Sequence, residues 1–243
     1  MRFLPLLLLL LLLCVPACGK TQPEKDTSND VVAIQALIDR FDDTEIIITT
    51  EPWYQTRLAF VDHAEAVAEF GECAVDPLIK VLEDENLQVR VAAAVALEKI
   101  GPAAIKASPL LREMLQSDDD RTNILACGII RGIGPGALEL VDLVIAQLDN
   151  ENFHVQYWAC RALGGAGSCA ESATDELVEL LETGFASVRR NAALALGKIY
   201  ACRCDQAPIH VVAALERVIE NDYSVPVKAA AKEALKNIHK VPC

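Results

Sequence analysis

Two aromatic and three basic side chains are the first candidates for binding chemistry in this chain. Tyr157 and Trp158 occupy positions at which three other segments of the chain carry small or aliphatic residues, whereas Arg190 matches Tyr157 in the segment that follows. Arg161 follows Trp158 by three residues, and Arg131 and Arg190 belong to the adjacent segments. Exposed Tyr, Trp and Arg are the residues that most often anchor protein partners, so this set predicts a partner-binding spot. The alternative is that Trp158 fills space inside the fold while the arginines are simply solvated.

Cysteine thiols are the second candidates. Cys169 and Cys202 lie just past helix ends in neighbouring segments, and Cys204 follows closely. A disulfide from Cys169 to either of the other two is a possible outcome in an oxidising compartment. The rival is a metal site made by these thiols and His210. Because Cys-x-Cys is not the usual zinc spacing and no second cysteine pair accompanies it, we expect no metal.

Motifs for catalysis are missing from the sequence. It contains no phosphate-binding glycine loop, no His-Glu-x-x-His and no Gly-x-Ser-x-Gly. The glycines of Gly164 to Gly167 fall at a predicted helix end and are interpreted as a cap. We therefore expect no catalytic residues, no cofactor and no enzymatic activity. The formal net charge of −13 also argues against nucleic acid as a partner.

The elements that must position these residues are read from an internal repeat. Alanine recurs every 33 residues and once more after 39, at Ala93, Ala126, Ala159, Ala192 and Ala231. Two columns of large aliphatic residues precede it, namely Leu78, Leu111, Val144 and Leu177, and Leu82, Leu115, Leu148 and Leu181. This period, helical in both halves, predicts an all-α solenoid of about five to six stacked helix pairs. The complete pairs are expected at about 75–101, 108–134, 137–167, 172–200 and 209–239. Within them, Cys127 and Cys160 share one position and should be small buried hydrophobes.

The repeats resemble HEAT repeats of the short, alanine-rich kind found also in the phycobilisome-lyase-like group. The motif is Val-Arg, then Ala-Leu, then Ile-Gly, and it is best preserved from Val89 to Gly101 and from Val188 to Ile199. The resemblance implies the solenoid fold, and in that family an Arg after Val and an Asp six residues earlier often form a ladder between repeats. In this chain the ladder is interrupted in the middle repeats. Activity on a tetrapyrrole-bearing partner, as in the bilin lyases, is the alternative function that the resemblance suggests.

The N-terminal residues predict export. Arg2 and the apolar run Phe3 to Leu13 are typical of a secretory signal that is too short for a stable transmembrane span. The residues Val15 to Cys18 resemble a bacterial lipobox, which implies lipidation of Cys18 after cleavage. Ordinary cleavage that leaves Cys18 as a plain thiol is the alternative. Gly19, after the lipid site, favours the outer membrane where two membranes are present.

The chain is therefore expected to divide into a signal peptide (1–17), a lipid-anchored flexible linker (18–29), a degenerate N-terminal capping repeat (30–72), HEAT-like repeats (73–239) and a tail (240–243). The predicted function is a non-enzymatic scaffold, anchored to the membrane of the bacterial envelope, that binds an unknown protein partner through its concave face. A second copy of the chain is an equally possible partner.

Overall fold

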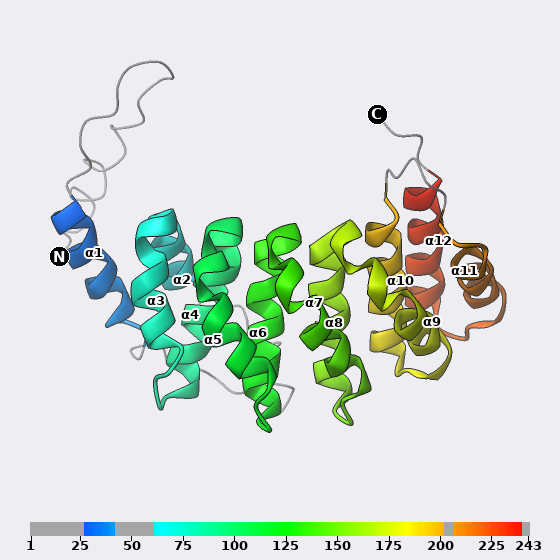
Figure 1. The fold of residues 1–243 in the computed structure, drawn as a ribbon, viewed down its shortest axis with the longest axis horizontal. Coiled ribbons are helices and arrows are strands. Elements are labelled where there is room, and N and C mark those ends of the chain that lie inside the picture. Colours follow the sequence, from blue (N-terminus) through cyan, green and yellow to red (C-terminus); the bar gives the residue numbers. More distant parts are fainter. Residues whose placement is uncertain (1–26, 42–60, 202–206, 240–243) are drawn as a thin grey trace, which may run out of the picture.

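The protein is a stack of antiparallel helix pairs (Figure 1). The computed structural model describes residues 27–41, 61–201 and 207–239. Its α-helices are α1 (Thr27–Ile38), α2 (Val61–Ala68), α3 (Val75–Val81), α4 (Leu87–Ile100), α5 (Ser108–Leu115), α6 (Asp120–Ile133), α7 (Val141–Ala146), α8 (Phe153–Ala166), α9 (Thr174–Thr183), α10 (Ala186–Ile199), α11 (Ile209–Asn221) and α12 (Val225–Ile238). Short 3-10 helices are η2 (Gly71–Ala74), η3 (Gly101–Ala107), η4 (Gly134–Leu140), η5 (Gln147–Asp149) and η6 (Gly167–Ala173). Over these ranges the predicted all-α solenoid of helix pairs is confirmed.

Capping side chains set the start of the second helix in three consecutive pairs. The residue before the helix has extended backbone, and its side-chain oxygen accepts a hydrogen bond from the N–H two residues later. The three caps are Asn86, Asp119 and Asn152, with N···O distances of 2.9, 3.3 and 2.9 Å. Each cap satisfies a backbone donor that the helix leaves open and stabilises the helix by about 1 kcal/mol.

Glycines with positive φ end the second helices α4, α6 and α8. The φ angles are 74°, 70° and 58° at Gly101, Gly134 and Gly167. The predicted glycine requirement is therefore met. The ψ angles lie between −132° and −140°, outside the left-handed helical region. This backbone region is open to glycine because it has no Cβ, and it turns the chain directly into the 3-10 helix that follows.

The core follows the predicted columns. All five alanines of the column are completely buried, as are Cys127 and Cys160. The eight aliphatic residues of the two preceding columns are each at most 4% exposed. Full burial of one such aliphatic side chain is worth about 1.5–3 kcal/mol, so the repeat pattern accounts directly for the stability of the stack.

Second helices form the more tightly packed layer of the solenoid. They contact their neighbours directly from α2 through α12, whereas contacts between successive first helices are sparser. Glycines permit this approach: a Cβ on Gly132 would lie 2.2 Å from the backbone of Glu98, and one on Gly165 would lie 2.7 Å from that of Arg131. Gly164 and Gly165 therefore serve close helix packing, and only Gly167 is the predicted cap. A stack bends toward its more closely spaced layer, so we assign the second helices to the inner face.

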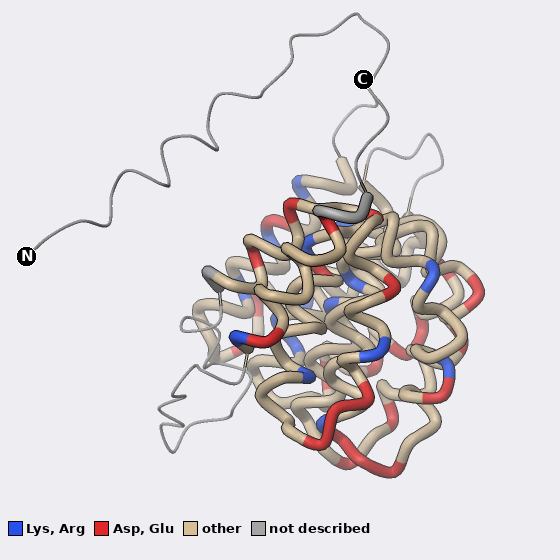
Figure 2. The backbone as a smooth tube through the Cα atoms, turned by 90° about the vertical axis from the view of Figure 1, so that its left-hand side faces the viewer, with Lys and Arg blue, Asp and Glu red and all other residues tan. Residues whose placement is uncertain are grey.

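Acidic side chains gather along one edge of the stack. The turns between the first and second helices of three successive pairs, together with the helix ends that border them, contain Glu83 to Glu85, Asp118 to Asp120 and Asp149 to Glu151. Figure 2 shows this acidic edge along the bottom of the molecule. Most of these side chains are exposed, as expected for groups that keep an acidic protein soluble.

One stretch of the described residues, Asp120–Asp149, is long and apolar enough to cross a membrane by length and composition. Its most apolar window is 67% buried in the protein. The turn at Gly134 divides the stretch between α6 and the helix of the next pair. We therefore assign it to the solenoid core.

The predictions for the N-terminal segments fall only partly within the residues that the structure describes. Helix α1 begins at Thr27, so the last three residues of the predicted linker are helical. The predicted signal peptide, Cys18, the stretch between α1 and α2 and the tail 240–243 lie outside the described residues.

Candidate functional site

Four of the five predicted partner-binding residues line one cavity on the second-helix face. The cavity has a volume of about 250 Å³ and is bounded by α6, α8 and α10. Arg131 comes from α6, Tyr157 and Arg161 from α8, and Arg190 from α10. Lys198, also on α10, completes the set of cations. We call these five residues the basic pocket.

The aromatic residues hold Arg161 in place. Its Nη1 donates a hydrogen bond to the Tyr157 hydroxyl at 3.1 Å. Its guanidinium carbon lies 4.4 Å from the centre of the Trp158 ring and 5.4 Å from that of Tyr157. Stacking on aromatic faces is a favourable environment for arginine and preserves its charge. Tyr157 and Trp158 thus position one cation of the basic pocket.

Trp158 itself is not an exposed anchor. It is 6% exposed and belongs to the core, so the alternative interpretation, in which it fills space between repeats, is correct for this residue. The physical reason is its place on α8, beside the fully buried Ala159 and facing the interior. The three arginines line the cavity next to Trp158: Arg161 stacks on its ring, Arg131 pairs with Glu98, and Arg190 is exposed.

Within the basic pocket the acids do not balance the cations. Arg131 forms an ion pair with Glu98 on α4. Arg161, Arg190 and Lys198 make no ion pair with any described residue. In contrast, several lysines and arginines elsewhere in the described chain pair with carboxylates of neighbouring repeats, as in Lys99–Glu65, Lys106–Glu72 and Arg217–Glu182. Three cations therefore line one cavity without an ion pair to a described carboxylate, and Glu233 acts on Lys198 only from beyond ion-pair distance.

Lys198 was missed by the comparison of repeat columns. It follows Arg190 by eight residues, two turns of helix with Leu194 between them, and this spacing could have revealed it as a residue of the same face. Its pKa is below the ordinary lysine value, first because of burial and then because of Arg131 and Arg161. The lowered pKa therefore reflects the partial burial of Lys198 first and the positive charge of its neighbours second.

The buried cysteine thiols at and near the cavity do not support nucleophilic chemistry there. Cys160 lines it but is completely buried. Burial raises the pKa of Cys160, and raises that of Cys127 to about 12. A buried neutral thiol is not a nucleophile, so both cysteines act as the small hydrophobes that we predicted.

The proposed disulfide and metal residues are only partly within the described ranges. Cys169 is half-buried and free among the described residues, whereas Cys202 and Cys204 lie outside them. The rival metal ligand His210 lies with Nε2 3.2 Å from an oxygen of Asp175. The described residues contain no group of three or more His, Cys, Asp or Glu that could hold a metal ion.

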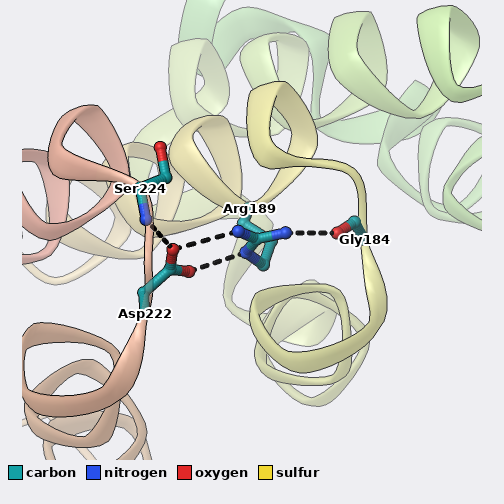
Figure 3. Close-up of polar contacts among 4 residues, drawn as sticks. All are labelled: Gly184, Arg189, Asp222 and Ser224. Carbon is teal, nitrogen blue, oxygen red and sulfur yellow. Dashed lines mark hydrogen bonds and ion pairs between the residues drawn. The ribbon is translucent and has the colours of Figure 1, made fainter.

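A buried ion pair near the start of α10 joins the last two repeats. Arg189 donates two hydrogen bonds to Asp222, at 2.7 and 3.0 Å, and a third to the carbonyl of Gly184 at 2.9 Å (Figure 3). Asp222 also accepts from the N–H of Ser224 at 2.7 Å. These contacts hold the pKa of Asp222 below its usual range, chiefly through the hydrogen bonds of Arg189. We call this pair the buried rung.

Other repeats use the same positions differently. Arg90 donates to the backbone carbonyl of Asp84 at 2.8 Å, and its counterpart Asn123 donates to that of Ser117 at 3.1 Å. Between the second and third complete repeats, the carboxylate of Asp120 accepts from the amides of Asn150 and Asn152 instead of from an arginine. The ladder expected from the family resemblance is thus ionic at the buried rung and mostly closes loops within single repeats elsewhere.

Comparison with known proteins agrees with the architecture. Solved structures similar to this chain include an engineered protein (TM-score 0.57, 21% identity, covering 85% of this chain and 98% of that one). They also include a computationally designed armadillo repeat protein for modular peptide recognition (TM-score 0.55, 19% identity, 88% and 95%). The complex of CpcE and CpcF of phycocyanin lyase from Nostoc sp. is similar at a TM-score of 0.46 (17% identity, 84% and 99%).

Sequence comparison identifies the repeats. Comparison with curated proteins found no match. The solved structures share the fold at low identity and carry no statement about activity. The HEAT-repeat family, in contrast, matches residues 54–129 and 139–236. Because these residues make up more than half of the chain, the protein belongs to the HEAT-repeat family.

Proposed function

We propose that this protein is a non-enzymatic scaffold that binds another protein through its second-helix face, with the basic pocket at the centre of the contact. One observation carries the proposal: Arg161, Arg190 and Lys198 face a single cavity without an acidic partner among the described residues. Unpaired cations held close together cost stability. A bound partner that supplies negative charge would remove that cost.

The fold is consistent with such a role. A solenoid presents an extended, rigid surface rather than an enclosed site. The cavity, at about 250 Å³, is smaller than the roughly 300–1,000 Å³ of sites that enclose a drug-sized ligand. It can accommodate side chains of a partner but not a tetrapyrrole. No observation among the described residues favours the bilin-lyase alternative.

Photocrosslinking tests the contact surface. A photoreactive benzoylphenylalanine at position 157, in place of Tyr157, should give a discrete adduct in extracts of the source cells. The same group at position 113, in place of the exposed Glu113 on α5 of the first-helix layer, is the matched control. The adduct at 157 should disappear when Arg190 and Lys198 are changed to Glu. Equal adducts at both positions, or an adduct that survives the charge reversal, would contradict the proposal.

The location of the scaffold is a second part of the proposal. The lipobox-like residues that end at Cys18 support a lipid anchor at the cell envelope. The full chain and Cys18→Ser should be expressed in a bacterial host and compared by intact mass and membrane partitioning. We expect an acylated product in the membrane fraction that is lost in Cys18→Ser. An unmodified product in both cases would remove the anchor but leave the binding proposal unaffected.

A further inference from the structure

We infer that the basic pocket recognises carboxylates of an extended acidic segment in the partner protein. The inference rests on the proposed function and goes beyond it by naming the chemistry that is bound. It is carried by the sign of the charge, by the arrangement of the cations on three helices and by the way Arg161 is held.

The positive charge of the basic pocket is unusual for this acidic protein. The chain has a formal net charge of −13, so a cation on its surface meets an acidic neighbour easily. A second cavity, lined by residues of α9, α10 and α11, contains Arg189 and Arg217, but these are paired with Asp222 and Glu182. A third is lined only by acidic and amide residues of the acidic edge. Of these cavities only the basic pocket has positive charge to spare.

The cations form a row across the helices. Arg161 and Arg190 come from α8 and α10, and Arg131, which is paired with Glu98, continues the row on α6; these are consecutive second helices in direct contact. Packed helix axes lie about 8–10 Å apart. In an extended chain, residues two apart lie on one face at a spacing of about 7 Å, and residues three apart span about 10 Å. An extended segment that runs along the solenoid can therefore place acidic side chains two or three residues apart against successive cations.

The way Arg161 is held suits a carboxylate. Its guanidinium is fixed by the Tyr157 hydroxyl and the Trp158 ring, and neither neutral group reduces its charge. A cation that is already oriented loses little side-chain entropy when it binds an anion. Arg190 and Lys198 lie on one stripe of α10 and can close over the same group from the other side of the cavity.

Trp158 supplies the readout for the test. The full chain with Trp53→Phe has Trp158 as its single tryptophan, and Arg161 stacks on that ring. The probes are a synthetic peptide that alternates Glu and Ser, the same peptide with Gln in place of Glu, and inorganic phosphate. Each is titrated by fluorescence and by calorimetry, so that binding is measured even where the emission does not change. We expect the Glu peptide to bind more tightly than the Gln peptide and than phosphate.

Matched variants connect that binding to the basic pocket. Arg190→Gln with Lys198→Gln should raise the Kd of the Glu peptide about tenfold or more, because the carboxylates of the peptide then lose two positively charged partners in the pocket. Arg112→Gln with Lys80→Gln removes two exposed positive charges from the first-helix layer and should change the Kd less than about twofold. Equal losses in the two variants, or equal binding of the Gln peptide, would overturn the inference.

The remaining outcomes separate the inference from the proposal on which it rests. Phosphate that binds as tightly as the Glu peptide would make the pocket a site for free oxyanions and would contradict recognition of an acidic segment. Failure of the Glu peptide to bind, with the crosslink at position 157 retained, would make this inference wrong while the scaffold proposal stands. Peptide binding without a charge-dependent crosslink would preserve the acidic-segment specificity and contradict the scaffold proposal.

Discussion

Arg189 and Arg190 are consecutive residues with opposite uses. Arg189 is 7% exposed and donates three hydrogen bonds, two to Asp222 and one to Gly184. Arg190 is exposed, lines the basic pocket and has no ionic partner among the described residues. Neighbouring residues on a helix point about 100° apart, so one arginine faces the next repeat and the other faces the pocket.

The comparison shows how one residue type divides between stability and binding. The buried rung satisfies the donors of Arg189 inside the protein, and nothing outside is needed. The basic pocket leaves its cations to water or to a partner. Substitutions in the two places should therefore separate stability from binding. The loss of stability should be largest at the buried rung and smallest in the basic pocket.

The largest effect is expected at the buried rung. Asp222→Ala leaves Arg189 charged, buried and without its carboxylate, which typically costs about 3–5 kcal/mol of unfolding free energy. Urea unfolding at pH 7 measures it. Because the pKa of Asp222 is lowered in the folded state, its contribution is present above the unfolded value of about 3.9 and is lost as pH falls through the lowered pKa. The acid-induced loss of stability should thus be smaller in Asp222→Ala, and unchanged acid sensitivity would contradict this explanation.

A smaller effect is expected where α8 meets α6. A Cβ on Gly165 would lie 2.7 Å from the backbone oxygen of Arg131, so Gly165→Ala must separate the helices at a cost of about 1–3 kcal/mol. Gly136→Ala is the control, because its Cβ would make an ordinary contact of 3.5 Å and should change stability by less than about 0.5 kcal/mol. Thermal unfolding of both variants measures the difference. Equal destabilisation would mean that helix contact is not the reason for glycine here.

The exposed pair Arg217–Glu182 should matter less than either. Its side chains are 60% and 58% exposed at 2.7 Å separation, and such pairs contribute about 0–1 kcal/mol. Arg217→Gln should therefore lower the unfolding free energy by less than about 1 kcal/mol, and less still in high salt. The same urea titration, repeated at two salt concentrations, makes the comparison with Asp222→Ala direct.

The smallest loss, or a gain, is expected in the basic pocket. Lys198 faces Arg131 and Arg161 on neighbouring helices, Arg190 on its own and the distant charge of Glu233, and its pKa is lowered. Between that lowered pKa and about 10.4 the unfolded chain binds more protons, so wild-type stability rises with pH in this window. Lys198→Gln should remove this rise and leave stability at pH 7 unchanged or higher. A clear loss of stability at pH 7 would mean that Lys198 is a structural residue.

Particular residues show how far the sequence can be interpreted. The alanine and leucine columns predict the helix pairs closely, because a position that repeats in a stack meets the same neighbours each time. Tyr157, Arg161, Arg131 and Arg190 were also predicted together, since departures from a repeat stand out against it. For Trp158 the sequence left two interpretations open, an exposed anchor or a buried space-filling residue, because it does not show which way a helix is turned relative to its neighbours. Lys198 was missed because it lies on the stripe of Arg190 and not at a position that differs in the repeat.

The amino-acid sequence by itself determined the architecture of this protein. The period recurs from unit to unit, and the N-caps and the glycines at the ends of α4, α6 and α8 each act within a few residues. The tertiary structure alone decided which charges are paired. Arg189 meets Asp222 across 33 positions of sequence, whereas Arg190 meets no acid among the described residues. Pairing depends on the rotation and spacing of packed helices, and only the assembled stack determines these.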